Sequence, residues 1–181
     1  MVSLICLVYS HGGVVLLPKF DASGPALQDA WVGGSCYGCG PANPKGHRIK
    51  SYWSEDGTEV VAVFQPQPEH NAGFENVMYG GLIASLIDCH SIWTAIGHAY
   101  RAEGREHGAA PAISYVTGTL TVRFLKPTPI DRPVVLRAHV VEAQGKKALV
   151  SCEVYSGETK TAEGDVTAVR FSMDKSVGVG V

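Results

Sequence analysis

One long apolar segment constrains this sequence more than any other feature. Residues 80–100 predict a helix whose apolar side chains leave no polar face, and a helix that is apolar all round must be surrounded by other protein. Asp88 and His90 stand at its centre, and a carboxylate at the middle of a bilayer costs about 3 kcal/mol. The segment therefore predicts a helix buried inside protein and not a membrane span.

Alternating apolar and polar residues predict strands on both sides of this helix. The predicted strands cover residues 47–53, 58–64, 113–126, 134–143, 147–155 and 162–171. No helices alternate with the later strands, so the predicted class is α+β and not α/β. A sheet that curls around the helix would bury it, and the sheet of a second copy could extend the cover, which predicts a dimer.

Charge and cysteine content narrow the class of protein. Lys and Arg number 15 against 17 Asp and Glu, so the basic stripe of a nucleic-acid binder is not expected. Five cysteines are too sparse for a secreted disulfide scaffold, and the apolar run at 4–9 lacks the basic start of a signal peptide. We expect a cytoplasmic protein without nucleic-acid or membrane partners. Its predicted parts are an extension at 1–45, one domain at 46–172 and a tail at 173–181.

Asp88 and the pair Gly80-Gly81 are the first candidates for chemistry. Burial disfavours a charged carboxylate and raises its pKa, which is common in catalytic sites. Paired glycines at a helix start leave backbone N–H groups uncovered, and these groups suit a developing oxyanion. A structural aspartate and a tight turn that only glycine can make remain open as alternatives.

Histidine and asparagine side chains near the glycine pair are weaker candidates. His70 and Asn71 lie in the loop before the glycines, where substrate contacts are common. His90 lies about 200° round the helix from Asp88, so the two cannot form a catalytic dyad. We expect His90 to be a packed core residue.

The Cys36-x-x-Cys39 pair is too small for a structural zinc site, which wants four ligands. His47 is close enough in sequence to help, but no second cysteine pair exists, and Cys89 is most simply a core residue. The sequence also has no phosphate loop, dinucleotide fingerprint or nucleophile elbow. We expect neither a metal nor a cofactor.

Two segments resemble a known family. Residues 70–88, HNAGFENVMYGGLIASLID, resemble the hotdog-fold acyl-CoA thioesterases of the phenylacetate-degradation (PaaI-like) type, and residues 36–46, CYGCGPANPKG, resemble the lead-in of one branch. The resemblance spans roughly residues 36–172. It implies an antiparallel sheet wrapped around one long buried helix, in a homodimer or a dimer of dimers with sites at the interface.

The resemblance also implies roles for particular residues. Gly80 would supply the oxyanion N–H, and Asp88 of the opposite subunit would act as general base or nucleophile. Asn71 or His70 would orient the substrate carbonyl, and Thr117 falls where some members place a hydroxyl that positions water.

The remaining expected site residues concern binding. Tyr79, directly before the pair Gly80-Gly81, stands where the family often has histidine. A tyrosine pKa near 10 makes it a poor base, although it can donate a hydrogen bond. The CoA nucleotide needs cations at the mouth of the site. Four residues are candidates for this, and each is equally well explained as a solvated surface charge: Arg101, Arg105, Lys126 and Lys45.

The implied reaction is hydrolysis of an acyl-CoA thioester by water. A hydratase or dehydratase of the same fold is an alternative, but those enzymes usually carry an acid nearer the helix start, where this sequence has Ser85. A non-catalytic acyl-CoA binding module is the alternative from another class.

Overall fold

The computed structural model describes residues 9–10, 13–14 and 19–171. The elements follow in this order: β1 (Tyr9–Ser10), β2 (Gly13–Val14), η1 (Leu27–Ala30), β3 (Ser51–Trp53), β4 (Val60–Phe64), η2 (Pro68–His70), α1 (Gly80–Ala102), β5 (Ser114–Phe124), β6 (Val134–Gln144), β7 (Lys147–Ser156) and β8 (Thr159–Phe171). The predicted long helix and six predicted strands are confirmed. The predicted tail at 173–181 and the apolar run at 4–8 lie outside the described residues.

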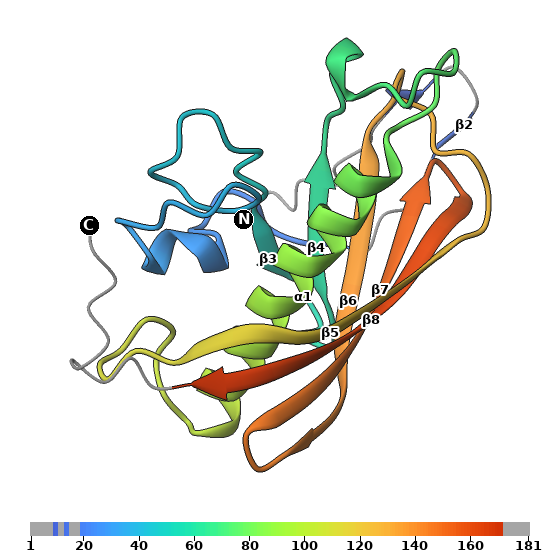
Figure 1. Cartoon of the computed structure of the whole chain (residues 1–181). Helices are drawn as coiled ribbons and strands as arrows, with labels where there is room; N and C mark the ends of the chain where they lie inside the picture. Colours follow the sequence, from blue (N-terminus) through green and yellow to red (C-terminus); the bar gives the residue numbers. More distant parts are fainter. Residues whose placement is uncertain (1–8, 11–12, 15–18, 172–181) are drawn as a thin grey trace.

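Six strands form one antiparallel sheet in the order β3-β4-β6-β7-β8-β5. The sheet curves, and α1 lies across its concave face (Figure 1). This is the α+β hotdog arrangement that the resemblance implied. No helix in the described part of the chain is long and apolar enough to cross a membrane.

Strand β7 illustrates why the sheet and the helix fit together. Its side chains alternate between buried and partly buried along its whole length, because successive residues of a strand point to opposite faces. Ala148, Val150, Cys152 and Val154 form the buried set and join the core around α1. On β8, a Cβ added at Gly164 would lie only 2.9 Å from Ile87 Cγ2, so the helix packs almost directly on the strand backbone.

One strip of α1 is left open in the single chain. Most of the helix is buried, but five side chains on one side are only partly buried or exposed: Gly81, Ala84, Ser85, Asp88 and Ile92. These positions fall within about 100° of one another around the helix axis. The sheet therefore covers most of the apolar helix but not its whole circumference.

The segment before β3 is tied to α1 by a buried polar chain. Gln28 Nε2 donates to Ser51 Oγ at 2.7 Å, and Ser51 Oγ lies 2.8 Å from His90 Nδ1. His90 Nε2 donates to the Val60 carbonyl at 3.1 Å. Burial lowers the pKa of His90 to about 4, so the ring is neutral and Ser51 donates to Nδ1. The expectation of a packed core histidine is confirmed.

Candidate active site

The first turn of α1 has two backbone N–H groups without partners. The N–H groups of Leu82 and Ile83 donate to the Tyr79 carbonyl at 3.0 and 3.2 Å. No acceptor among the described residues takes the N–H of Gly80 or Gly81, as expected for the first residues of a helix. These two groups, at the positive end of the helix dipole, can bind an anion or a developing oxyanion.

Aromatic side chains approach both glycines closely. A Cβ on Gly80 would lie 3.2 Å from Phe124 Cζ, and a Cβ on Gly81 would lie 2.5 Å from the Tyr79 ring. Tyr79 is the N-cap of α1 and makes no side-chain cap, and its side chain is 59% exposed. Two aromatic rings therefore lie against the first two residues of the helix.

His70 and Asn71 lie directly beside this turn. The Tyr79 N–H donates to the His70 carbonyl at 2.8 Å, and Asn71 forms an isolated bridge with Met78. The Asn71 amide is partly used within the loop, because Nδ2 donates one of its two hydrogens to the Phe74 carbonyl at 3.0 Å and Oδ1 accepts the N–H two residues on.

His70 keeps one nitrogen for other contacts. Its Nδ1 accepts the Gln67 N–H at 2.9 Å, so the neutral ring carries its proton on Nε2, which has no partner in the described part of the chain. The ring packs against Phe64 and His47, with centroids 5.4 and 5.6 Å apart. Burial, and then the charge of His70, lower the pKa of His47. His70 Nε2–H and the second hydrogen of Asn71 Nδ2 are therefore both available to orient a carbonyl.

Asp88 and Thr117 form a second cluster. Thr117 Oγ1, on β5, donates a hydrogen bond to Asp88 Oδ1 in the middle of α1. Asp88 is only partly buried and Thr117 is exposed, which corrects the expectation of a fully buried carboxylate. The carboxylate stands on the open strip of the helix, and no described residue donates to its second oxygen.

A bulge in β5 sets the direction of Thr117. The pairing of β5 with β8 shifts register between Thr117 and Thr119, and bulges of this kind re-aim side chains. A Cβ on Gly118 would lie 2.9 Å from Val169 Cγ2 and 3.2 Å from the Thr167 carbonyl. Sequence reasoning missed Gly118, because a single glycine inside an alternating strand is only a weak signal of a bulge.

The two clusters lie too far apart to act together within one chain. Eight residues separate Gly80 from Asp88, which is about 12 Å along a helix axis. A catalytic base has to come within about 3 Å of the proton that it takes, and an oxyanion donor must come equally close to the same reacting group. The two groups of candidate residues, or half-sites, therefore stay separate within one chain.

The two candidate arginines make side-chain contacts within the described part of the fold that the two candidate lysines do not make. Arg101 lies at the far end of α1, about 30 Å from Gly80 by helix rise; its guanidinium stacks 3.4 Å above the Trp53 ring and donates to the Gly57 carbonyl at 2.9 Å. Arg105 pairs with Glu103 at 2.9 Å. Both arginines are thus engaged in holding the fold together.

The two lysines differ from the arginines. The ammonium groups of Lys126 and Lys45 make no ion pair with any described residue. Lys126 follows Phe124, whose ring packs on Gly80. Lys126 is therefore two residues from a side chain that contacts the helix N-terminus, whereas Arg101 lies at the opposite end of α1.

Comparison with known proteins identifies the family of this chain. The family model described as "Thioesterase superfamily" matches residues 75–163. A thioesterase superfamily protein from Shewanella loihica PV-4 is 34% identical, with a TM-score of 0.52, over 68% of this chain and 91% of that chain. The chain belongs to the thioesterase superfamily.

More distant relatives of this thioesterase superfamily member are acyl-CoA thioesterases. Acyl-coenzyme A thioesterase THEM4 from Rattus norvegicus is 26% identical over 129 residues, which cover 71% of this chain and 50% of the relative. The chain spans about half the length of the curated relatives that it matches. The E. coli PaaI protein of the phenylacetic acid degradation operon shares the fold, at 16% identity and a TM-score of 0.54 over 68% of this chain and 78% of that chain.

A third thiol joins the cysteine pair of this thioesterase superfamily member. Cys89 lies in the buried core as expected, and the Sγ atoms of Cys36, Cys39 and Cys89 all lie within 4.8 Å of one another. His47 does not join them, since it packs with Tyr37 at 4.8 Å between ring centroids and beside His70. A hydrogen bond with Cys89 lowers the pKa of Cys39 to about 6, and one from the Trp93 N–H adds to the shift.

Proposed function

We propose that this chain hydrolyses acyl-CoA thioesters to a free acid and CoA, as a cytoplasmic homodimer or dimer of dimers. One observation carries the proposal: a helix N-terminus with two free N–H groups and a hydrogen-bonded carboxylate stand about 12 Å apart on one helix. Membership of the thioesterase superfamily and the likeness to acyl-CoA thioesterases support the substrate class. Two copies are needed to bring the two half-sites to one thioester.

The proposed dimer pairs the open strip of α1 and the strand β5 of two copies. β5 is an edge strand of the sheet, and an unpaired edge is a template for a second chain. Val116, Phe124 and Leu125 on or beside it are 47, 57 and 45% exposed, which is a large apolar exposure for one strand. A two-fold axis beside β5 would produce two identical sites. Each would combine Asp88 and Thr117 of one copy with Gly80 and His70 of the other.

In the proposed mechanism, water attacks the thioester carbonyl, and the carbonyl oxygen gains negative charge. The Gly80 N–H would stabilise that charge more strongly in the transition state than in the substrate. Thr117 occupies one oxygen of the Asp88 carboxylate, which leaves Oδ2 to take the proton from water as general base. The His70 Nε2–H would orient the carbonyl or the acyl group. Lys126 would contact the phosphates of CoA.

The first experiment tests the carboxylate. Asp88→Asn should lower kcat for acyl-CoA hydrolysis by about 10²-fold, the scale for loss of a positioned base. Asp165→Asn, on β8 and in a surface ion pair with Arg123, is the matched control and should keep the native rate. Free thiol release from short, long and aryl acyl-CoA substrates gives the rates and also defines the acyl preference. Native rates for the Asp88 variant would refute the assignment, and binding without turnover across the panel would favour a binding module.

The second experiment tests the N–H group. Gly80→Pro removes the N–H at the first helical position, where proline is tolerated, and Tyr79 already has the extended backbone (φ −60°, ψ 124°) that precedes proline. Gly80→Ala adds a Cβ at the same position but keeps the N–H. We expect kcat to fall at least tenfold further for the proline variant, with KM little changed. Equal rates for the two variants would exclude an oxyanion role.

The third experiment tests whether the sites are shared between copies. Asp88→Asn and Gly80→Pro chains are each nearly inactive, and co-expression yields about half heterodimers. If each site combines two copies, one of the two sites in every heterodimer is intact, so about a quarter of the native activity should return. No recovery, in a mixture shown to contain heterodimers, would mean that each site lies within one chain. After a single turnover in ¹⁸O water, label in the Asp88 carboxylate would identify a nucleophile, because a general base gains no oxygen.

A further inference from the structure

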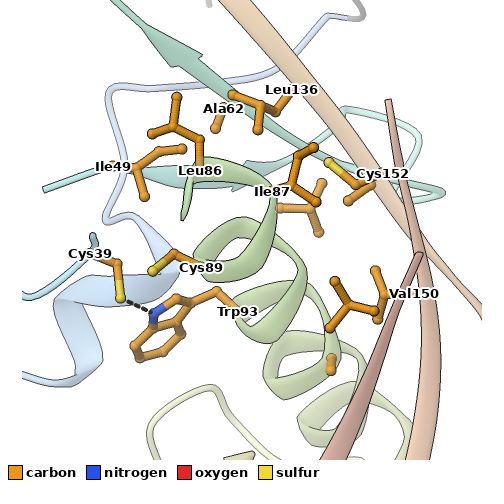
Figure 2. Packing of buried hydrophobic residues seen from close by; sticks show 14 of the residues in the cluster. Cys39, Ile49, Ala62, Leu86, Ile87, Cys89, Trp93, Leu136, Val150 and Cys152 are labelled. Carbon is orange, nitrogen blue, oxygen red and sulfur yellow. Dashed lines mark hydrogen bonds between the residues drawn. The ribbon is translucent and has the colours of Figure 1, made fainter. Parts of the chain in front are cut away.

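Three cysteine sulfurs from two distant segments meet beside α1. Cys36 Sγ and Cys89 Sγ lie 3.8 Å apart, and all three Sγ atoms, including that of Cys39, lie within 4.8 Å of one another. Figure 2 shows Cys39 and Cys89 on the same side of the helix, next to the Trp93 indole. The cluster takes no part in the proposed hydrolysis.

We propose that Cys36, Cys39 and Cys89 bind one zinc ion as a three-thiolate site, with the fourth position open to water or another small ligand. Zinc takes thiolates at about 2.3 Å in a tetrahedral arrangement, so its sulfurs lie about 3.8 Å apart. The Cys36–Cys89 separation of 3.8 Å already fits this value. Cys39 Sγ lies within 4.8 Å of the other two sulfurs, so binding one ion requires it to approach them by about 1 Å at most.

The loop that carries two of the ligands is fixed by its backbone. Gly40 N donates to the Cys36 carbonyl at 2.9 Å and Ile49 N donates to the Gly38 carbonyl at 3.1 Å. A Cβ on Gly38 would lie 2.4 Å from Cys89 Sγ, and one on Gly40 would lie 2.4 Å from Cys36 N. Only a loop with glycine at these positions can approach the helix sulfur so closely. The ligands are therefore preorganised across a sequence separation of some fifty residues.

The surroundings of the sulfurs suit thiolates that hold a cation. Trp93 Nε1 donates a hydrogen bond to Cys39 Sγ at 3.2 Å, and such outer contacts orient metal ligands. Cys39 and Cys89 are buried and Cys36 is half-buried, which leaves entry for an ion on the Cys36 side. No Lys or Arg among residues 19–171 bonds to these sulfurs. Buried anions need a compensating charge, and a bound dication would supply it.

Cobalt substitution tests the proposal without reference to activity. The protein is purified in reducing buffer, freed of metal with a chelator, and titrated with Co²⁺. We expect an intense near-ultraviolet band from sulfur-to-cobalt charge transfer, saturating at one ion per chain, and its displacement by Zn²⁺. With zinc at about 100 times its dissociation constant, the midpoint of thermal unfolding should rise by about 5–10 °C.

Single Cys→Ser variants identify the ligands. Cys36→Ser, at the half-buried position, should fold and lose most of the charge-transfer band, and Cys39→Ser should behave in the same way. Cys152→Ser is the matched control, because Cys152 is buried on the sheet side of α1 beside Ile87 (Figure 2); its band should equal that of the native protein. Three results would overturn the proposal. The native protein could show no charge-transfer band, or the Cys152 variant could lose as much of the band as the Cys36 variant. The protein purified in reducing buffer could also contain a Cys36–Cys89 disulfide and bind no metal. None of these results depends on whether the chain hydrolyses acyl-CoA.

Discussion

Replacing Ser51 by alanine should destabilise this protein far more than a serine-to-alanine change usually does. Ser51 Oγ accepts the Gln28 amide at 2.7 Å and donates to His90 Nδ1 at 2.8 Å, and all three side chains are fully buried. Alanine leaves an amide N–H and a ring nitrogen unpaired at once. Each unpaired buried group costs about 1–3 kcal/mol, so we expect a loss of about 3 kcal/mol.

The assay is urea unfolding followed by tryptophan fluorescence at one fixed protein concentration, because association would shift the apparent stability. For a chain of this size, the expected loss also lowers the thermal midpoint by about 6–12 °C. Ser151→Ala is the control. The Ser151 side chain is partly buried, and its hydroxyl has no partner among the described residues, so its loss should change the free energy of unfolding by less than 1 kcal/mol.

The energetic coupling between Gln28 and Ser51 can be measured with a double variant. If Gln28 and Ser51 act through one network, the double variant Gln28→Leu with Ser51→Ala should lose less free energy than the two single variants added together. A loss below 1 kcal/mol for Ser51→Ala, at an unchanged dependence on urea, would refute the reasoning. So would strict additivity, since it would mean that the three polar groups do not depend on one another.

Three further predictions concern pH, the bulge and the cations. His90 has a pKa of about 4 in the folded chain and about 6.5 in the unfolded chain, so the unfolded chain binds more protons between these pH values. In the presence of a chelator, the free energy of unfolding should be level above pH 6.5 and should fall by about 3 kcal/mol between pH 6.5 and pH 4. The His90→Gln variant should not show this loss. Gly118→Ala should lower kcat by about 10- to 100-fold by displacing the hydroxyl beside it, whereas Gly33→Ala, with open space around its Cβ, should leave kcat unchanged. Lys126→Met should raise KM for acyl-CoA and make KM less sensitive to ionic strength, because salt screens an exposed ionic interaction. Arg101→Met should lower the thermal midpoint and leave KM unchanged. The reverse pattern would indicate that Arg101, and not Lys126, contacts CoA.

The long elements could be predicted from sequence because their patterns are local. An apolar run of helical length and strands that alternate over ten residues or more depend little on distant partners. The first predicted strand is shorter than expected for a non-local reason. His47 N and Ile49 N donate to the carbonyls of Tyr37 and Gly38, so the lead-in loop takes hydrogen bonds that β4 would otherwise receive, and β3 begins only at Ser51.

The candidate site was predictable where its residues lie close together in sequence. Gly80 and Asp88 belong to one motif, but the contact between Asp88 and Thr117 became a candidate only through family resemblance. The sequence did not indicate that Cys89 lies beside Cys36 and Cys39, because Cys89 stands within an apolar run about fifty residues after them. Arg101 looked like a free surface cation, since nothing in the sequence reveals the Trp53 ring beneath it.

The place of α1 in the chain has a consequence for synthesis on the ribosome. The strands that pack on the helix most extensively are β5, β6, β7 and β8, and all of them follow it, with β8 ending at Phe171. At roughly 5–20 residues per second, the nascent chain holds an almost wholly apolar helix without its cover for several seconds. During that interval the helix offers a binding surface for chaperones, and the yield of native protein should depend on their supply more than its final stability suggests.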